Sequence, residues 1–285
     1  MEESKTIFID KFWQWNVWEE IIYWSEEMIV RIGAIFYQKT IEKKVYLCYI
    51  KWEKGKKKGS INMKLVDAYV NLEKIDGVKM MKKIEKAGRT CYKSNVLGED
   101  SYKKFINNII GNGHESVIEH EKVTVVIGCD VGAYKDITRS RLASYSIEST
   151  RYCNYGKDKF GNELKFFRPC HIKEGTEEYK IWERTMLEIE KSYIELSKLG
   201  AAPDQLRMLL PHSTAAEMVM TCNLREWRHV LKLRCSKHTH PSIRQFFIPL
   251  LLYFKEVMPE VFNDVPYDED FPKEDYAKIN LMDAE

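Results

Sequence analysis

The stretch "RSRLASYSIESTRY", residues Arg139 to Tyr152, concentrates groups that bind anions. It holds three arginines, and six hydroxyl side chains precede its final tyrosine. Arginine grips phosphate through two parallel hydrogen bonds, and serine hydroxyls and turn amides supply further donors. Its apolar residues fit neither a strand period nor a helix period well, which predicts a shaped loop. The stretch therefore indicates either a binding loop for a phosphorylated ligand or an ordinary basic surface loop.

The composition restricts the class of protein. The chain has 285 residues, 44% of them hydrophobic, which is enough for one large or two small domains. A net charge of +2 argues against a general nucleic-acid binder, which is normally strongly basic. The seven cysteines contain no C-x-x-C pair, so they suit a reducing cytoplasm better than a disulfide framework, and no metal site is predicted. No signal-like start and no long uncharged apolar run is visible, which favours a cytoplasmic protein without a membrane span.

The composition changes near residue 62. Five of the seven tryptophans come before this point and all eight prolines come after it. The segment "KGSINM", ending at Met63, can be encoded by AAAGGA, three codons and ATG, which is the layout of a bacterial ribosome-binding site before a start codon. We therefore expect Met63 to be the natural start, residues 1–62 to be an extension from a misassigned start, and residues 63–285 to form the functional domain.

From Met63 onward the pattern predicts mixed α and β structure. Strands are expected at residues 64–72 and 121–130, and helices at residues 76–91, 101–113, 176–200 and 223–234 and after Pro241. Asn223 and Glu226 have the spacing of a helix-capping box. The acidic tail from Asp264 is expected to be loosely held.

Three further clusters carry candidate functional side chains. In "GNGHESVIEH", residues 111–120, the histidine spacing does not match the H-E-x-x-H pattern of zinc sites. In "NLREWRHVLKLR", residues 223–234, helical spacing places Arg225, His229 and Lys232 on one face. Arg207 is the single charge of the apolar segment "QLRMLLP". Each cluster alone also fits a packing or capping role.

In their order along residues 63–257, these clusters resemble the flavin-dependent thymidylate synthases. The resemblance rests on six segments: "AGRTCYKS", "GHESVIEH", "RSRLASYSIESTRYCNY", "LRMLLP", "NLREWRHVLKLR" and "THPSIRQ". The family motif is Arg-His-Arg, seven residues and then Ser, and Arg139, Arg141 and Ser149 match it. The resemblance implies an α+β fold with a central antiparallel sheet flanked by helices, assembled as a homotetramer with shared active sites.

The resemblance also implies a reaction and its residues. The expected reaction is methylation of dUMP to dTMP, with 5,10-methylenetetrahydrofolate as the carbon donor and NADPH reducing through FAD. The implied dUMP-binding residues are Glu148, Ser149, Thr150, Arg151, Arg207 and Arg234, of which Ser149, Arg151 and Arg234 are the catalytic candidates. The implied FAD-binding residues are Cys91, His114, Ser116, Arg139, Ser140, Arg141, Asn223, Arg225 and His229. Ser149 has no evident base to activate it, so we favour a binding role for it.

Three positions depart from the family pattern. Ser140 replaces the motif histidine, Ile147 replaces a Gln or Glu, and Asp136 stands where several members have Gln. An acidic group near a phosphate is unfavourable unless an arginine pairs with it. One alternative is therefore a degenerate relative that binds flavin and nucleotide without turnover. An alternative from another class is a single-stranded nucleic-acid-binding module that uses the lysine run at 51–58 and the early tryptophans.

Overall fold

The computed structural model describes residues 64–283. In chain order its elements are β1 (Lys64–Val66), β2 (Tyr69–Glu73), α3 (Gly77–Tyr92), α4 (Ser101–Gly111), η2 (Glu115–His120), β3 (Lys122–Asp130), α5 (Val131–Ile137), β4 (Ser144–Ile147), η3 (Asp158–Phe160), β5 (Lys165–Phe167), α6 (Glu177–Lys198), α7 (Pro203–Leu206), η4 (Arg207–Leu209), β6 (Ala215–Asn223), α8 (Leu224–Arg234), α9 (Pro241–Val257), α10 (Pro259–Phe262), η5 (Lys273–Asp275) and β7 (Lys278–Met282). The proposed extension and Met63 lie outside the described residues, so the boundary at residue 62 stays a prediction.

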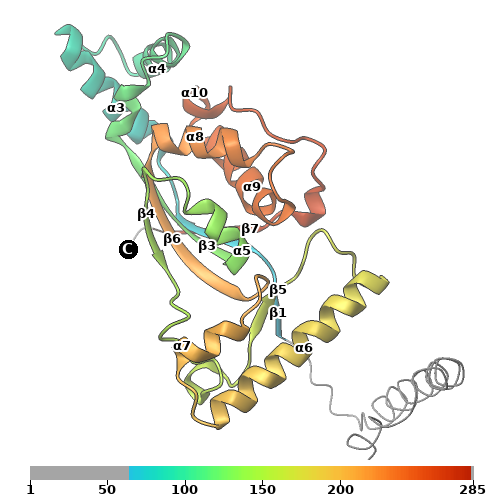
Figure 1. The fold of residues 1–285 in the computed structure, drawn as a ribbon. Coiled ribbons are helices and arrows are strands. Elements are labelled where there is room, and N and C mark those ends of the chain that lie inside the picture. Colours follow the sequence, from blue (N-terminus) through green and yellow to red (C-terminus); the bar gives the residue numbers. More distant parts are fainter. Residues whose placement is uncertain (1–63, 284–285) are drawn as a thin grey trace, which may run out of the picture. The chain divides into compact units, whose positions relative to one another are not determined.

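A five-stranded sheet in the order β4-β6-β3-β2-β7 forms the centre (Figure 1). From β4 through β6 and β3 to β2, each strand is antiparallel to the next, and β7 adds to β2 in parallel. β1 and β5 form a separate two-stranded parallel sheet. The predicted α+β fold with a central, mainly antiparallel sheet is confirmed.

One face of this sheet carries the main core. Along β6 the residues alternate, with Ala216, Met218, Met220 and Cys222 buried and their neighbours more exposed. α8 and α9 lie together against the buried face (Figure 1). The buried indole of Trp227 in α8 donates its N–H to the carbonyl of Val123 in β3, at 3.0 Å. The buried side chains at every second residue of β6 therefore pack in one core with the apolar faces of α8 and α9.

A smaller core lies under the long helix α6. It is built from Leu164, Phe166, Met186, Tyr193 and Leu206. Figure 1 shows α6 and α7 at the opposite end of the sheet from α3 and α4. No helix within residues 64–283 is long and apolar enough to cross a membrane.

The predicted helices are confirmed as α3, α4, α6, α8 and α9. α3, α6, α8 and α9 each begin with a side-chain cap, whereas α4 has none. The side chain of Asn223 accepts a hydrogen bond from the Glu226 N–H at 2.9 Å, as the capping spacing predicted. The side chain of Asp76 accepts from the Lys79 N–H in the same way at the start of α3. Local sequence chemistry therefore defines where these helices begin.

Three predictions of local structure were wrong. Residues 64–72 form two strands rather than one, because β1 pairs with β5 and β2 pairs with β3 and β7. The loop predicted for 139–152 contains the edge strand β4, which pairs with β6. The tail from Asp264 is held firmly, since Val265 and Phe271 are buried and β7 joins the sheet. Each of these outcomes depends on pairing between distant parts of the chain, which local patterns do not contain.

Candidate active site

The segment that carries the Arg-x-Arg motif is a tight turn between α5 and β4. The Tyr145 hydroxyl, from β4, donates to the carbonyls of Ile137 and Ser140, at 3.1 and 2.8 Å. Partial burial raises the pKa of Tyr145 to about 12, so the phenol stays protonated and able to donate. This contact fixes the turn with Arg139 and Arg141 exposed, while Ser140 is only 8% exposed.

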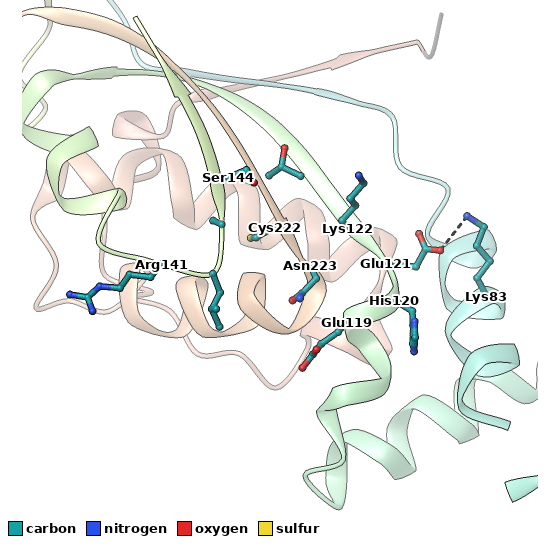
Figure 2. A pocket seen from close by; sticks show the side chains of 12 residues that line it. Lys83, Glu119, His120, Glu121, Lys122, Arg141, Ser144, Cys222 and Asn223 are labelled. Carbon is teal, nitrogen blue, oxygen red and sulfur yellow. Dashed lines mark ion pairs between the residues drawn. The ribbon is translucent and has the colours of Figure 1, made fainter. Parts of the chain in front are cut away.

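A pocket of about 720 Å³ opens beside this turn (Figure 2). Its walls come from α3, η2, β3, β4 and β6, and in the view of Figure 2 Arg141 and Lys83 lie on opposite sides. The lining residues are Lys83, Glu119, His120, Glu121, Lys122, Arg141, Leu142, Ala143, Ser144, Thr221, Cys222 and Asn223. Two predicted flavin residues, Arg141 and Asn223, are therefore brought to one pocket. Lys83 is partly neutralised there by Glu121, at 3.2 Å.

Other predicted flavin residues lie on η2 and α8, which an ion pair joins. His114 and Ser116 are exposed at the start of η2, and Arg225 and His229 are exposed on α8. Arg225 contacts Glu119 of η2 at 2.6 Å. The structure thus places these two short segments side by side. Cys91 is exposed in the last turn of α3, and within residues 64–283 no hydrogen bond or ion pair joins it to the other predicted residues.

A second pocket, of about 600 Å³, lies at the other end of β6. It is lined in part by Tyr69, Glu148, Tyr155, Thr214 and Glu217. The Tyr155 hydroxyl donates to Glu148 at 2.7 Å, and the Tyr69 hydroxyl donates to Glu217 at 2.6 Å. Burial, reinforced by the neighbouring carboxylate, raises the pKa of both tyrosines. Of the predicted dUMP residues, only Glu148 lines this pocket, and its carboxylate is already engaged.

The three predicted dUMP arginines differ in environment. Arg151 is exposed and lies over the ring of Tyr152, with 5.9 Å between its guanidinium carbon and the ring centroid. Arg207 is exposed in η4. Arg234, the last residue of α8, is half-buried, and burial lowers its pKa. Its Nη2 donates to the carbonyl of Asp136, and its buried Nε has no hydrogen-bond partner within the described part of the chain.

Ser149 and Thr150 follow β4 in a turn and are both partly exposed. The hydroxyl oxygen of Ser149 accepts a hydrogen bond from the Arg151 N–H at 3.4 Å. Over residues 64–283, no histidine or carboxylate hydrogen-bonds this hydroxyl, so no base is in place to activate it.

Asp136, one of the departures from the family pattern, contacts two predicted site residues. Its carboxylate lies 3.8 Å from Nε of Arg139, and its carbonyl accepts from Arg234. The acidic group that the sequence places near the expected phosphate therefore has an arginine beside it.

Sequence reasoning missed Arg228, which is only 1% exposed. Its guanidinium contacts Glu115 of η2 at 3.1 Å and Asp264 at 2.6 and 2.7 Å, and it also donates to the carbonyl of Val261. Helical spacing was the available signal, because Arg228 shares the buried face of α8 with Leu224 and Leu231. A buried arginine on an apolar face requires acidic partners.

Comparisons with known proteins identify the chain's family. The family described as "Thymidylate synthase complementing protein" matches residues 75–260. The chain belongs to this family. Among curated members, the flavin-dependent thymidylate synthase of Pyrococcus abyssi is 35% identical over 150 residues, which cover 52% of this chain and 61% of that protein. The corresponding protein of Geobacter sulfurreducens is 29% identical over 186 residues, covering 62% of this chain and 78% of that protein.

A solved structure supports the fold of this member of the thymidylate synthase complementing protein family. The UMP/dUMP methylase PolB from Streptomyces cacaoi, bound with 5-Br dUMP, superposes with a TM-score of 0.57 and 20% identity, covering 70% of this chain and 96% of that one. At this identity the likeness supports the fold alone. For the Pyrococcus abyssi and Thermococcus onnurineus relatives the chain spans only 61% and 60% of their length.

Proposed function

We propose that this protein methylates dUMP to dTMP, with 5,10-methylenetetrahydrofolate as the carbon donor and NADPH as the reductant acting through FAD. Curated relatives are named flavin-dependent thymidylate synthases, and one similar solved structure is a methylase of UMP and dUMP. One structural observation carries the proposal. Arg141 of the Arg-x-Arg motif and Asn223 at the start of α8 are far apart in the sequence but line the same pocket.

The donor set of that pocket suits a flavin dinucleotide. Lys122 and Arg141 supply positive charge for phosphates, whereas Lys83 is partly neutralised by Glu121. The side-chain amide of Asn223 can hydrogen-bond a polar edge of the flavin ring. The residues we assign to FAD are Cys91, His114, Ser116, Arg139, Ser140, Arg141, Asn223, Arg225 and His229. When bound, FAD supplies the hydride chemistry, and this chain binds and orients it.

The three arginines assigned to dUMP differ in how exposed their side chains are. Arg151 and Arg207, both exposed, are suited to gripping the phosphate. Arg234 is half-buried and held by the carbonyl of Asp136, so its charge is less screened and is suited to polarising a uracil carbonyl. Ser149, with Glu148 and Thr150, is assigned to binding. A nucleophilic role for Ser149 is disfavoured because its hydroxyl lacks a base.

We further propose a homotetramer in which each active site uses residues of more than one copy. Large apolar side chains stand exposed directly beside three site arginines: Leu142 after Arg141, Tyr152 after Arg151 and Met208 after Arg207. Their exposed fractions are 76%, 78% and 84%. Exposed apolar groups around a polar site are typical of a surface that another subunit covers. Sedimentation of the purified chain tests the stoichiometry.

The deciding experiment is anaerobic dTMP formation by the purified chain. The mixture contains dUMP and methylenetetrahydrofolate, with FAD and NADPH each omitted in turn. We expect dTMP only when both are present. FAD and dUMP binding without any dTMP would instead establish the degenerate relative that binds without turnover.

The nucleic-acid-binding alternative has its own test. Tight binding to single-stranded DNA that weakens steeply with salt, in a chain that binds neither FAD nor dUMP, would favour it over the synthase. For the synthase we propose a cytoplasmic location, where reducing conditions keep cysteines as thiols. The six cysteines within residues 64–283 are all free.

A further inference from the structure

A buried charged junction connects the two segments to which we assign flavin contacts. Arg228 lies on the buried face of α8, and Glu115 is the first residue of η2. Nε and Nη2 of Arg228 both lie 3.1 Å from Oε1 of Glu115. Glu115 sits between His114 and Ser116, so this contact fixes the backbone that carries both.

The other side of the Arg228 guanidinium is held by the segment after α9. Asp264 accepts from Nη1 and Nη2 at 2.6 and 2.7 Å, and the carbonyl of Val261 accepts from Nη1. These bonds hold the pKa of Asp264 below its ordinary value. With partners on both sides, the guanidinium has little freedom to rotate. Arg228 therefore holds η2 in a fixed position relative to α8.

A second ion pair joins the same two elements nearer the surface. Arg225 contacts Glu119 at 2.6 Å, one helical turn along both segments from the buried pair. Two arginines of α8 thus hold two glutamates of η2. A pair of contacts fixes both the distance and the rotation of η2 relative to α8, which one contact cannot do.

We infer that Arg228 is a positioning residue for flavin binding, acting through Glu115 to hold His114 and Ser116 in register with Arg225 and His229. The inference rests on the proposed function, because it takes those four residues as flavin contacts. Arg228 is not among the residues that line the pocket beside the Arg-x-Arg turn. Supporting residues of this kind are needed where a site is assembled from separate short segments.

The test uses the full chain with Glu115→Ala, Glu115→Gln and a matched control, Asp268→Ala. Asp268 pairs with Arg244, another largely buried arginine, but does not contact η2. We expect Glu115→Ala to weaken FAD binding about tenfold, by analogy with the lower end of the range measured for supporting residues around metal sites. Glu115→Gln should recover most of the affinity, because its amide oxygen still accepts from Arg228. Asp268→Ala should lose stability but keep its FAD affinity within about twofold of wild type.

Titration of FAD, followed by flavin fluorescence and by the absorbance spectrum of the bound flavin, separates the outcomes. Chemical denaturation measures the stability of each variant alongside. Unchanged FAD affinity in Glu115→Ala would overturn the inference, as would an equal loss of affinity in Asp268→Ala. A folded wild-type chain that binds no FAD overturns the proposed function, and the inference with it. A wild type that binds FAD beside an unaffected Glu115→Ala overturns the inference alone.

Discussion

Arg234 at the end of α8 donates a hydrogen bond to the main-chain carbonyl of Asp136 in α5. The carboxylate of the same Asp136 lies 3.8 Å from Arg139. One residue therefore contacts an arginine assigned to dUMP and an arginine assigned to FAD. A substitution of Asp136 removes its carboxylate but keeps its main-chain carbonyl. The contact with Arg139 can therefore be tested separately from the contact with Arg234.

Replacing Asp136 by Gln should strengthen FAD binding. The change removes the negative charge beside Arg139, which we assign to FAD, while the main-chain carbonyl still accepts from Arg234. Because the Asp136–Arg139 pair is largely exposed, the gain should be roughly two- to fivefold and should shrink at high salt. Calorimetric titration with FAD at two salt concentrations measures it. Weaker FAD binding than wild type would contradict the assignment of Arg139 to FAD.

Substitutions of Asn223 should separate its role as the N-cap of α8 from its proposed role in FAD binding. Asn223→Asp retains an acceptor for the Glu226 N–H, so the free energy of unfolding should stay near that of wild type. Asn223→Ala should lose about 1 kcal/mol because α8 loses its N-cap. Both should weaken FAD binding, since neither keeps the amide. Urea denaturation and FAD titration of the two variants give the comparison, and normal FAD affinity in Asn223→Asp would remove Asn223 from the flavin site.

The pairing of Asp264 with Arg228 should make stability depend on acid pH. Hydrogen bonding to Arg228 lowers the pKa of Asp264 in the folded state. The stabilisation is therefore complete above the unfolded-state pKa, about 3.9, and is lost as the pH falls through the folded-state pKa. Because the carboxylate is half-exposed, we expect Asp264→Asn to cost only about 1 kcal/mol at neutral pH. Denaturation at pH 7 and at pH 3 should show a smaller difference from wild type at the lower pH.

Gly128→Ala should destabilise the sheet. A Cβ at this position would lie 2.2 Å from the ring of Tyr69, which also donates to Glu217. The ring must move, at a cost of roughly 1–3 kcal/mol. Gly111→Ala is the control, because a Cβ there has no heavy atom within 4 Å, and in helix α4 it should be neutral or stabilising by up to about 1 kcal/mol. Thermal unfolding of both variants compares them, and equal stabilities would contradict the close packing of Tyr69.

Ser140→His restores the motif histidine in a confined position. The Ser140 side chain is nearly buried, so an imidazole has to displace its neighbours at roughly 1–3 kcal/mol. We expect a less stable protein and a wild type that forms dTMP without the histidine. Urea denaturation and the anaerobic dTMP assay on both proteins check this. Activity in Ser140→His alone would identify the wild type as a decayed synthase.

Features that depend on local chemistry were predictable from the sequence. The long helices and their caps follow from apolar spacing and from side chains such as Asn223. β4 was missed because its alternation of Ser144 and Ser146 with Tyr145 and Ile147 lasts only four residues. β7 was missed because its place in the sheet depends on a partner at the other end of the described chain.

The candidate site was also only partly predictable from the sequence. The sequence showed the motif arginines, but it did not show which residues contact them. The contacts of Arg228 with Glu115 and Asp264, and of Arg234 with Asp136, join segments distant in sequence. Only the fold determines which acidic group or carbonyl meets which arginine. Sequence spacing could place Arg228 on a buried face, but it could not identify what neutralises it.

The parallel pairing of β7 with β2 has a consequence for the order of folding during synthesis. β2 is the earliest strand of the central sheet to leave the ribosome and β7 is the last, and the side chain of Asn280 bonds that of Asn71 across them at 2.7 Å. Until β7 emerges, the outer side of β2 remains an open edge that another nascent chain could pair with. The interval between these two strands is therefore when the growing chain is most exposed to aggregation.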